Sequence, residues 1–386
     1  MTFAITSLFD TKEYTFATTT THLVRVNKAT KEVSFVTATL PDPPAADDAG
    51  AATATPSAAT VAIAATVSDS QVPFRPAGEG KGASVGVVSV GGGFGETAVV
   101  GVDRRVALVS DNGATVTVHE AEFERRISAL AFGSTADDMI VGLRHGGLHA
   151  GSPANPDYGH LAVVTALART DSYVVSGDRD GLIRIAHASA IFDVAAFALG
   201  HTHWVSALAT LPGRRFVSAA GDGTIRLWDL DRLPKAVSTI TFSGDSAVKS
   251  YVSSLLYLRG DSTLVAVVVN VTEGSSRLLR LRYDAAAGTL AEDATVASPV
   301  AHPLCVAAVA GSDSAYLVGG RDGQLAQVGE ETVYPTVVTA LAGEGTEHDV
   351  AWLFRSDRDR EGTVAAGDED LLSADAAAAK RAKMAA

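Results

Sequence analysis

The sequence has very little cysteine and no long apolar run. Its single cysteine, Cys305, excludes a disulfide within the chain and a metal site built from several cysteines, and it favours a reducing compartment. No segment approaches the roughly 20 consecutive apolar residues that a membrane span requires. The first residues, MTFAITSLFDTKEY, lack a basic start and include Asp10 and Glu13, so no signal peptide is expected. We therefore expect a protein without membrane association.

Positive charge is also scarce. The chain has 31 Lys and Arg residues against 44 Asp and Glu residues, which gives a net charge of −13 and an isoelectric point near 5.2. A protein that binds nucleic acid by itself usually presents a basic surface. An RNA-related role would therefore need a basic partner, or a local basic patch that the total charge conceals.

What the sequence does contain is a repeat in residues 159–230. It consists of two Gly-His pairs 41 residues apart, two Asp-Gly turns that each lead into an apolar run, and a final Trp-Asp pair. In order, these are Gly159-His160, Asp180-Gly181, Gly200-His201, Asp222-Gly223 and Trp228-Asp229. A Gly-His to Trp-Asp unit of about 40–45 residues is typical of a blade in a WD-repeat β-propeller, a four-stranded antiparallel sheet. The fold class is therefore expected to be all-β.

Polar residues in these repeats are spaced like the members of a buried hydrogen-bond chain. In the second repeat the expected members are His201, Ser218, Asp222 and Trp228. The carboxylate can accept from the imidazole, the hydroxyl can bridge, and the indole N–H finds an acceptor, so the network would specify one packing. In the first repeat the expected members are His160, Ser176 and Asp180, because Ser and Asp are again four residues apart. Ala186 stands where the tryptophan would be, so this chain is incomplete.

The length suits one propeller. Seven blades of about 45 residues need roughly 315 residues, so we expect a single propeller domain over 1–340. The N-terminal strand is expected to close the ring against the last blade. Residues 41–59 are rich in Pro, Ala and Asp and predict a disordered insert, and residues 341–386 predict a low-complexity tail, partly disordered or helical. Six or eight blades remain open, because several units match the repeat weakly.

Catalytic and metal-binding patterns are weak. His201 and His203 have no evident third ligand, and His145 and His149 lie in a Gly-rich stretch that is not helical. Residues 82–86 match GxSxG without the strand before and the helix after that a nucleophile elbow needs. The Gly-rich segments at 78–84 and 91–95 lack the spacing of phosphate-binding loops. We expect no catalytic residue, no metal site and no cofactor in this chain.

Three arginines are candidates for contacts outside the chain. Arg179 lies between Asp178 and Asp180 at a turn, where it either pairs with these carboxylates or faces a partner through its planar, five-donor head. Arg214 and Arg215, in the turn PGRRF, either form a solvated hairpin tip or give a local contact to RNA.

The 159–230 stretch resembles a particular family, the non-catalytic WD-repeat subunit of eukaryotic tRNA (guanine-N7-)-methyltransferase. The resemblance rests on SGDRD at 176–180, LGH at 199–201 and SAAGDG at 218–223 before IRLW. The D-R-D turn discriminates most, because generic repeats prefer D-D-G or H-D-G there. The family's arginine maps onto Arg179. Some members place a lysine near the following loop for a carboxylate of the partner, and here the loop offers Thr202 and His203 instead.

The resemblance implies a function. A separate Rossmann-type subunit would bind S-adenosylmethionine and methylate N7 of a guanine in the tRNA variable loop. The propeller would do no chemistry. It would form a heterodimer with this partner, dock side-on, stabilise it and help hold the tRNA. The family is nuclear, and the basic cluster Lys380, Arg381 and Lys383 is a weak candidate for an import signal, with a cytoplasmic location also open. The rival hypotheses are a WD-repeat scaffold of another complex, such as a ubiquitin ligase or a ribosome-assembly factor, and an enzyme built on a propeller.

Overall fold

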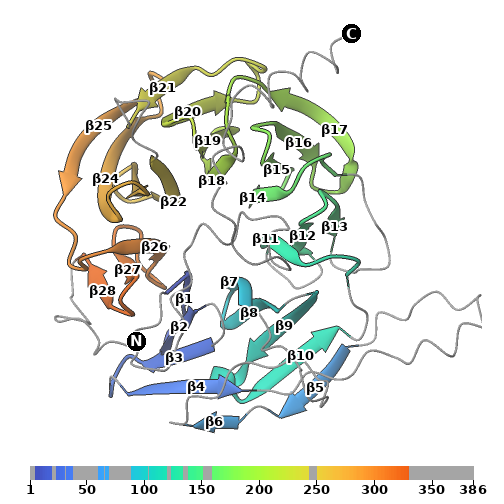
Figure 1. The fold of residues 1–386 in the computed structure, drawn as a ribbon, viewed down its shortest axis with the longest axis vertical. Coiled ribbons are helices and arrows are strands. Elements are labelled where there is room, and N and C mark those ends of the chain that lie inside the picture. Colours follow the sequence, from blue (N-terminus) through green and yellow to red (C-terminus); the bar gives the residue numbers. More distant parts are fainter. Residues whose placement is uncertain are drawn as a thin grey trace, which may run out of the picture.

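Seven antiparallel sheets form a ring around a central axis in the computed structural model (Figure 1). The structure describes residues 5–19, 23–30, 32–37, 60–64, 66–68, 88–102, 104–119, 123–133, 138–150, 159–242 and 250–329. One edge strand of each sheet lies nearest the axis, and it contacts the corresponding inner strands of both neighbouring sheets around the ring. The fold is thus a seven-bladed β-propeller, as the repeat length predicted. Six and eight blades are excluded as alternatives.

The blades are numbered here in ring order, with their strands in the order of hydrogen-bonded neighbours. Blade 1 contains β1 (Ser7–Asp10), β2 (Tyr14–Thr18), β3 (Leu23–Asn27), β4 (Val33–Thr37) and β6 (Thr66–Ser68). Blade 2 contains β5 (Thr60–Ala64), β10 (Thr115–His119), β9 (Arg105–Ser110), β8 (Thr97–Val102) and β7 (Val88–Phe94), with a short 3-10 turn, η2, at Asp111–Gly113. Blade 3 contains β11 (Ile127–Ala131), β12 (Ile140–Leu143) and β13 (Leu148–Ala150).

Of the remaining four blades, blades 4 and 5 contain the repeat of residues 159–230. Blade 4 contains β14 (Val164–Arg169), β15 (Tyr173–Asp178), β16 (Ile183–His187) and β17 (Ala190–Ala198). Blade 5 contains β18 (Val205–Leu211), β19 (Arg215–Ala220), β20 (Thr224–Asp229) and β21 (Ser238–Thr241). Blade 6 contains β22 (Ser250–Leu258), β23 (Thr263–Asn270), β24 (Ser275–Asp284) and β25 (Thr289–Val296). Blade 7 contains β26 (Pro303–Ala308), β27 (Tyr316–Gly320) and β28 (Leu325–Val328).

The hydrophobic core lies between blades rather than within them. Strand residues alternate between the two faces of each sheet, so each blade presents apolar side chains to both neighbours. Between blades 4 and 5, for example, Ile183 and Ile185 pack with Val205, Phe216 and Trp228. Each blade therefore depends on its neighbours for burial, which makes the closed ring the stable unit.

The ring closes by packing between blades 1 and 7. The Ile5 amide donates to the carbonyl of Gly320 at 3.1 Å, and the Cys305 Sγ lies 3.6 Å from the Ile5 carbonyl oxygen. The N-terminal segment therefore lies against the last blade, while β1 itself belongs to the sheet of blade 1. The expected insert at 41–59 and the tail at 341–386 lie outside the described residues, so these expectations stay predictions.

The Asp-Gly turns have the backbone that their sequence requires. Gly181 and Gly223 have φ angles of +80° and +77°, in the left-handed region that a side chain disfavours. Each turn brings the end of one strand back into an antiparallel pair, β15 with β16 and β19 with β20. The turns thereby fix the position of the polar residues beside them.

Candidate functional site

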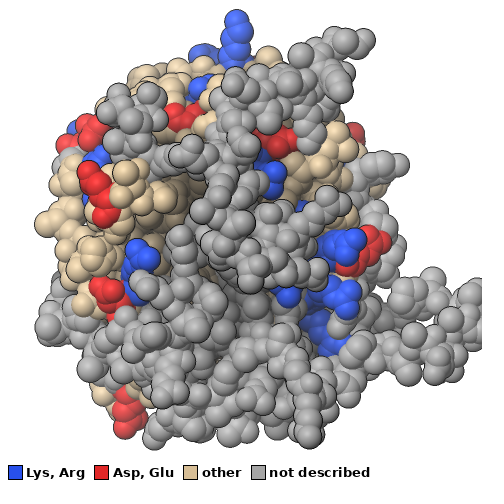
Figure 2. Space-filling view, in the orientation of Figure 1, with Lys and Arg blue, Asp and Glu red and all other residues tan. Residues whose placement is uncertain are grey.

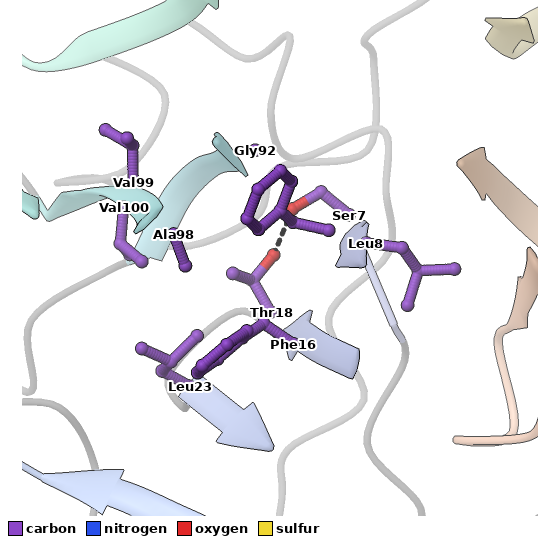
Figure 3. A pocket seen from close by; sticks show the side chains of 10 residues that line it. Ser7, Leu8, Phe16, Thr18, Leu23, Gly92, Ala98, Val99 and Val100 are labelled. Atoms are coloured by element: carbon purple, nitrogen blue, oxygen red, sulfur yellow. Dashed lines mark hydrogen bonds between the residues drawn. The ribbon is translucent and has the colours of Figure 1, made fainter. Parts of the chain in front are cut away.

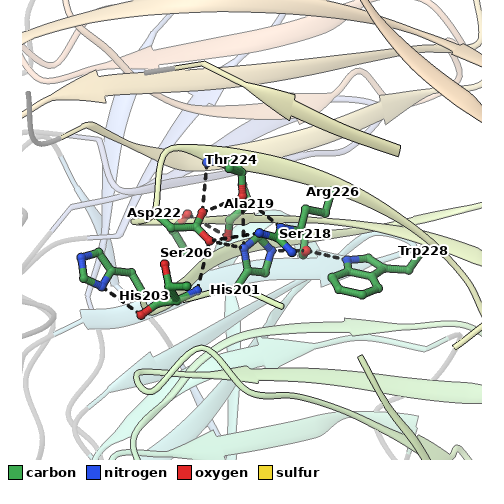
Figure 4. A network of polar contacts seen from close by, with 10 residues as sticks. His201, His203, Ser206, Ser218, Ala219, Asp222, Thr224, Arg226 and Trp228 are labelled. Carbon is green, nitrogen blue, oxygen red and sulfur yellow. Dashed lines mark hydrogen bonds and ion pairs between the residues drawn. The ribbon is translucent and has the colours of Figure 1, made fainter. Parts of the chain in front are cut away.

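Blade 5 contains an unbroken chain of hydrogen bonds from its outer side toward the turn after β19 (Figure 4). The Trp228 indole N–H donates to Ser218 Oγ at 2.7 Å. Ser218 Oγ lies 2.7 Å from His201 Nε2, and His201 Nδ1 lies 2.9 Å from a carboxylate oxygen of Asp222. One imidazole tautomer satisfies every link, with Nδ1–H donating to Asp222 and Nε2 accepting from Ser218. This is the chain that the spacing of these four residues predicts.

Asp222 is held ionised by this network. Burial of its side chain opposes ionisation, but the hydrogen bond with His201 outweighs that effect, with help from Thr224 and the Thr202 amide. Together they lower the pKa of Asp222 from its ordinary value of 3.8 to about 2. The carboxylate therefore ties the turn to the loop before β18. Its lone pairs are used for structure, which leaves little capacity for acid–base chemistry.

Blade 4 has the same chain with a different aspartate. His160 Nε2 lies 2.8 Å from Ser176 Oγ, and His160 Nδ1 lies 3.0 Å from Asp178 rather than from Asp180. The prediction of Asp180 was therefore wrong, and so was that of Asp178 as an interface residue, because Asp178 is only 2% exposed. Side chains two apart on a strand share a face, so Ser176 and Asp178 both reach the histidine. The period-two spacing could have shown this, but the Asp-Gly turn was the more visible signal.

The second oxygen of Asp178 organises the turn. It accepts from the amides of Asp180 and Leu182 at 3.0 and 2.8 Å. In blade 5 the equivalent strand position is Ala220, so the carboxylate there has to come from Asp222 in the turn. Ala186 fills the tryptophan position of blade 4, and Ser176 Oγ lies 3.4 Å from the Arg184 carbonyl.

Arg179, Thr202 and His203 lie at one end of the ring. The Arg179 amide donates to the Val163 carbonyl at 2.9 Å, which places the D-R-D turn beside the loop before β14. The Arg179 side chain is half-buried, and no ion pair or side-chain hydrogen bond joins it to a described residue. The alternative in which it pairs with Asp178 or Asp180 is therefore not what the structure contains. His203 Nδ1 lies 3.1 Å from the Thr202 carbonyl.

Arg214 and Arg215 lie at the opposite end of the ring, at the β18–β19 hairpin. Arg215 is engaged inside the fold, since it bonds to Asp229 at 3.2 Å and to the Tyr283 hydroxyl at 3.0 Å. This engagement removes Arg215 from the candidate RNA contacts. Arg214 is half-exposed, stacks over Tyr173 with 4.9 Å to the ring centre, and pairs with Asp231 at 3.2 Å. Its role toward RNA stays a prediction.

The structure also locates the other histidines and the Gly-rich segments that were considered as metal-binding, nucleophile or phosphate-binding sites. His149 is buried edge-on against Phe123, and the exposed His145 pairs with Glu124 at 3.5 Å. No group of three His, Cys, Asp or Glu side chains suited to a metal exists among the described residues. Residues 78–86 lie outside the described residues, and 91–95 form the end of β7 and its turn. In the described part of the chain, no helix has the length and apolar character needed to cross a membrane.

A hollow between blades 1 and 2 is too small for a cofactor (Figure 3). It is lined mainly by apolar side chains, among them Leu8, Phe16, Leu23 and Val100. Its volume of about 10 Å³ admits about one water molecule. It is a packing defect between two blades rather than a binding site.

Comparison with known proteins agrees with the sequence resemblance. Residues 155–328, which span blades 4 to 7, match the family model of the tRNA methyltransferase TRM82 WD40 domain. The tRNA (guanine-N(7)-)-methyltransferase non-catalytic subunit WDR4 of Mus musculus is 35% identical over 115 residues, and that of Homo sapiens is 32% identical over 115 residues. Each match covers 27% of this chain and 28% of the relative, so the chain matches little more than a quarter of their length.

Solved structures support the fold alone. A chain of the mitotic checkpoint complex superposes with a TM-score of 0.59 over 83% of this chain and 88% of that chain, at 16% identity. The structure of U3-55K gives a TM-score of 0.60 over 82% and 88%, at 14% identity. The ring is therefore a common propeller, and only blades 4 to 7 carry a more specific signature. Through residues 155–328, this chain is similar to the WD-repeat non-catalytic subunits of tRNA (guanine-N(7)-)-methyltransferases.

Proposed function

We propose that this chain is the non-catalytic scaffold subunit of a tRNA (guanine-N7-)-methyltransferase complex. The observation that carries the proposal is the match of residues 155–328 to the TRM82 WD40 domain, which includes the D-R-D turn. The relatives that match part of this chain are named as non-catalytic subunits. In this proposal the propeller stabilises the catalytic subunit and helps hold tRNA while a guanine of the variable loop is methylated at N7.

The chemistry is assigned to the partner. Asp178 and Asp222, the most deeply placed carboxylates beside histidine in blades 4 and 5, are committed to hydrogen-bond chains that hold turns. We therefore assign S-adenosylmethionine to a Rossmann-type catalytic subunit that forms a heterodimer with the propeller. Arg179, with Thr202 and His203 at the same end of the ring, is the candidate contact with that subunit.

The charge distribution supports the proposal that the catalytic subunit makes most of the contacts with tRNA phosphates. The chain carries a net charge of −13, and on the face in Figure 2 many Lys and Arg side chains lie beside Asp and Glu side chains. A surface of mixed sign attracts phosphate weakly, because counterion release depends on the number of uncompensated cations. We infer that the catalytic subunit makes most phosphate contacts and that the propeller adds few, with Arg214 as its candidate.

The test is affinity purification of the tagged chain from its own cells, with mass spectrometry of the recovered proteins. A near-stoichiometric S-adenosylmethionine-dependent methyltransferase is expected, and its N7-methylation of tRNA should rise when this subunit is added. Recovery of a ubiquitin ligase or of ribosome-assembly proteins, without a methyltransferase, would refute the proposal. Imaging of the same tagged chain tests the nuclear location that we propose with it.

A further inference from the structure

The outer strand of blade 4 exposes an unusual amount of apolar surface. Five of the six large hydrophobic side chains that are exposed in the described residues belong to this blade or the loops beside it. They are Leu161 (75% exposed), Phe192 (58%), Val194 (39%), Phe197 (41%) and Leu199 (53%). An exposed apolar group of this kind usually marks an interaction surface or a risk of aggregation. Three of them, Phe192, Val194 and Phe197, lie on one strand, β17, at the rim of the ring (Figure 1).

The pairing of β17 shows which way these side chains point. Phe197 pairs with Arg184, and Val194 pairs with Ala186. Directly paired residues share a face of the sheet. The alternate residues of β16, Ile183 and Ile185, pack into the core toward blade 5. Phe197 and Val194 therefore point toward blade 3. Phe192 lies within the register shift between Ala186 and His187, where its neighbour Ile191 is the residue that packs on blade 3.

In the described residues, blade 3 packs against Ile191 of β17 but leaves Val194 and Phe197 exposed. Its sheet there ends at its third strand, β13, whereas blade 4 continues to a fourth. Residues 151–158, which connect β13 toward blade 4, lie outside the described residues.

The backbone of β17 favours docking through side chains. Its pairing with β16 shifts register twice, between Ile185 and Ala186 and between Ala186 and His187. Such bulges twist an edge strand and hinder the addition of a further strand. The exposed phenylalanines, by contrast, are the residue type that anchors protein interfaces. An occupant of this surface would thus insert an apolar face against Phe192 and Phe197.

The surface continues to the candidate contacts at the end of the ring. Ala198 pairs with Ile183, which directly follows the turn that carries Arg179, and Leu199 leads into the loop with Thr202. A second copy of the chain is a poor occupant, because two molecules of charge −13 repel each other. The exposed carboxylates of Asp171 and Asp193 beside the strand also favour a partner of opposite charge.

We infer that Phe192, Val194 and Phe197 of β17 form the apolar docking surface for the catalytic subunit, with Arg179 at its end. This inference rests on the proposed function, which supplies a partner that must bind tRNA and is therefore expected to be basic. It specifies where the catalytic subunit docks, at the outer strand of blade 4, and by which contacts, apolar ones beside one arginine.

The test compares Phe192→Ser/Phe197→Ser with Val271→Ser in the full chain. Val271 is the sixth exposed hydrophobic side chain, 48% exposed, and lies just after β23 on blade 6. Binding to the purified catalytic subunit of the same organism is titrated by calorimetry. The double variant is expected to weaken binding by at least about 30-fold, as for loss of an aromatic anchor. Val271→Ser should change it by less than about twofold, and both variants should melt like the wild type.

Three other results would overturn the inference. Unchanged binding by Phe192→Ser/Phe197→Ser, with normal stimulation of tRNA methylation, would refute the docking surface and leave the proposed function standing. A wild-type chain that neither binds nor stimulates the catalytic subunit would refute the proposed function, and this inference with it. A wild-type chain that self-associates in light scattering, while the double variant stays monomeric, would assign the surface to a second copy.

Discussion

Arg214 and Arg215 are neighbours in the sequence, but their guanidinium groups join blade 5 to opposite neighbours. Arg214 donates to the Tyr173 hydroxyl of blade 4 at 2.9 Å, and Arg215 donates to the Tyr283 hydroxyl of blade 6 at 3.0 Å. Arg214 has a φ angle of +58°, which turns the hairpin tip so that consecutive side chains diverge. One hairpin thus connects three blades.

The two arginines should differ in their effect on stability. Arg215 is largely buried and also donates to the Ala285 carbonyl at 2.7 Å, so Arg215→Ala should lower the free energy of unfolding by about 1–2 kcal/mol. Arg214→Ala should cost less, because this side chain is half-exposed and its interactions are screened by water. Urea denaturation of both variants measures the difference. An equal loss in both would contradict the assignment of Arg215 as the inner connection.

The pKa of Asp222 predicts how stability depends on pH. Because that pKa is lowered from 3.8 to about 2 in the folded chain, the folded state binds fewer protons than the unfolded state in this range. The carboxylate therefore contributes about 2 kcal/mol above about pH 4, and this contribution is lost as the pH falls through 2. Denaturation at pH 2 to 6 should show a steeper decline for the wild type than for Asp222→Asn. Parallel curves would mean that the His201 contact does not hold the charge.

The two aspartates of the D-R-D turn, Asp178 and Asp180, should differ in their contribution to stability. Asp178→Ala should destabilise the chain by about 1–3 kcal/mol, because it leaves the buried His160 and two turn amides without their acceptor. Asp180→Ala should cost clearly less, since it leaves His160 and both turn amides with Asp178 as their acceptor. Thermal melting of the two variants decides between them. A larger effect at Asp180 would restore the assignment made from the sequence.

The sequence predicted the fold and blade 5 better than it predicted blade 4. In blade 5 the four network residues include a tryptophan and a turn aspartate, both of which stand out in the repeat. In blade 4 two aspartates compete, and only the strand register shows that Asp178 shares a face with Ser176. The tyrosine contacts of Arg214 and Arg215 join residues 41 and 68 positions apart, and no local pattern signals such pairs. The exposed face of β17 likewise depends on what blade 3 contributes, which is a property of the assembled ring.

Arg179→Ala should weaken the complex more than the fold. The Arg179 side chain forms no ion pair or side-chain hydrogen bond with a described residue, so its removal should leave the melting temperature of the isolated chain nearly unchanged. Affinity for the catalytic subunit should fall about tenfold, as for an interface arginine that faces a carboxylate. Arg179→Lys is the matched control, because it keeps the charge and loses the planar fork. A melting temperature that falls together with affinity would point to a structural role in the turn.

Cys305 offers a probe of ring closure, since it is the sole cysteine and lies where blade 7 meets the N-terminal segment. Burial raises the pKa of its thiol to about 12, and its Sγ contacts the Ile5 carbonyl. The reactive thiolate is therefore both scarce and covered in the closed ring. A thiol reagent should label the native chain very slowly and label it at once in denaturant. Ile5→Ala, which removes apolar packing at the junction, should speed native-state labelling while the Asp180→Ala chain labels like the wild type. Rapid labelling of the wild type under native conditions would mean that the junction of blades 1 and 7 opens readily.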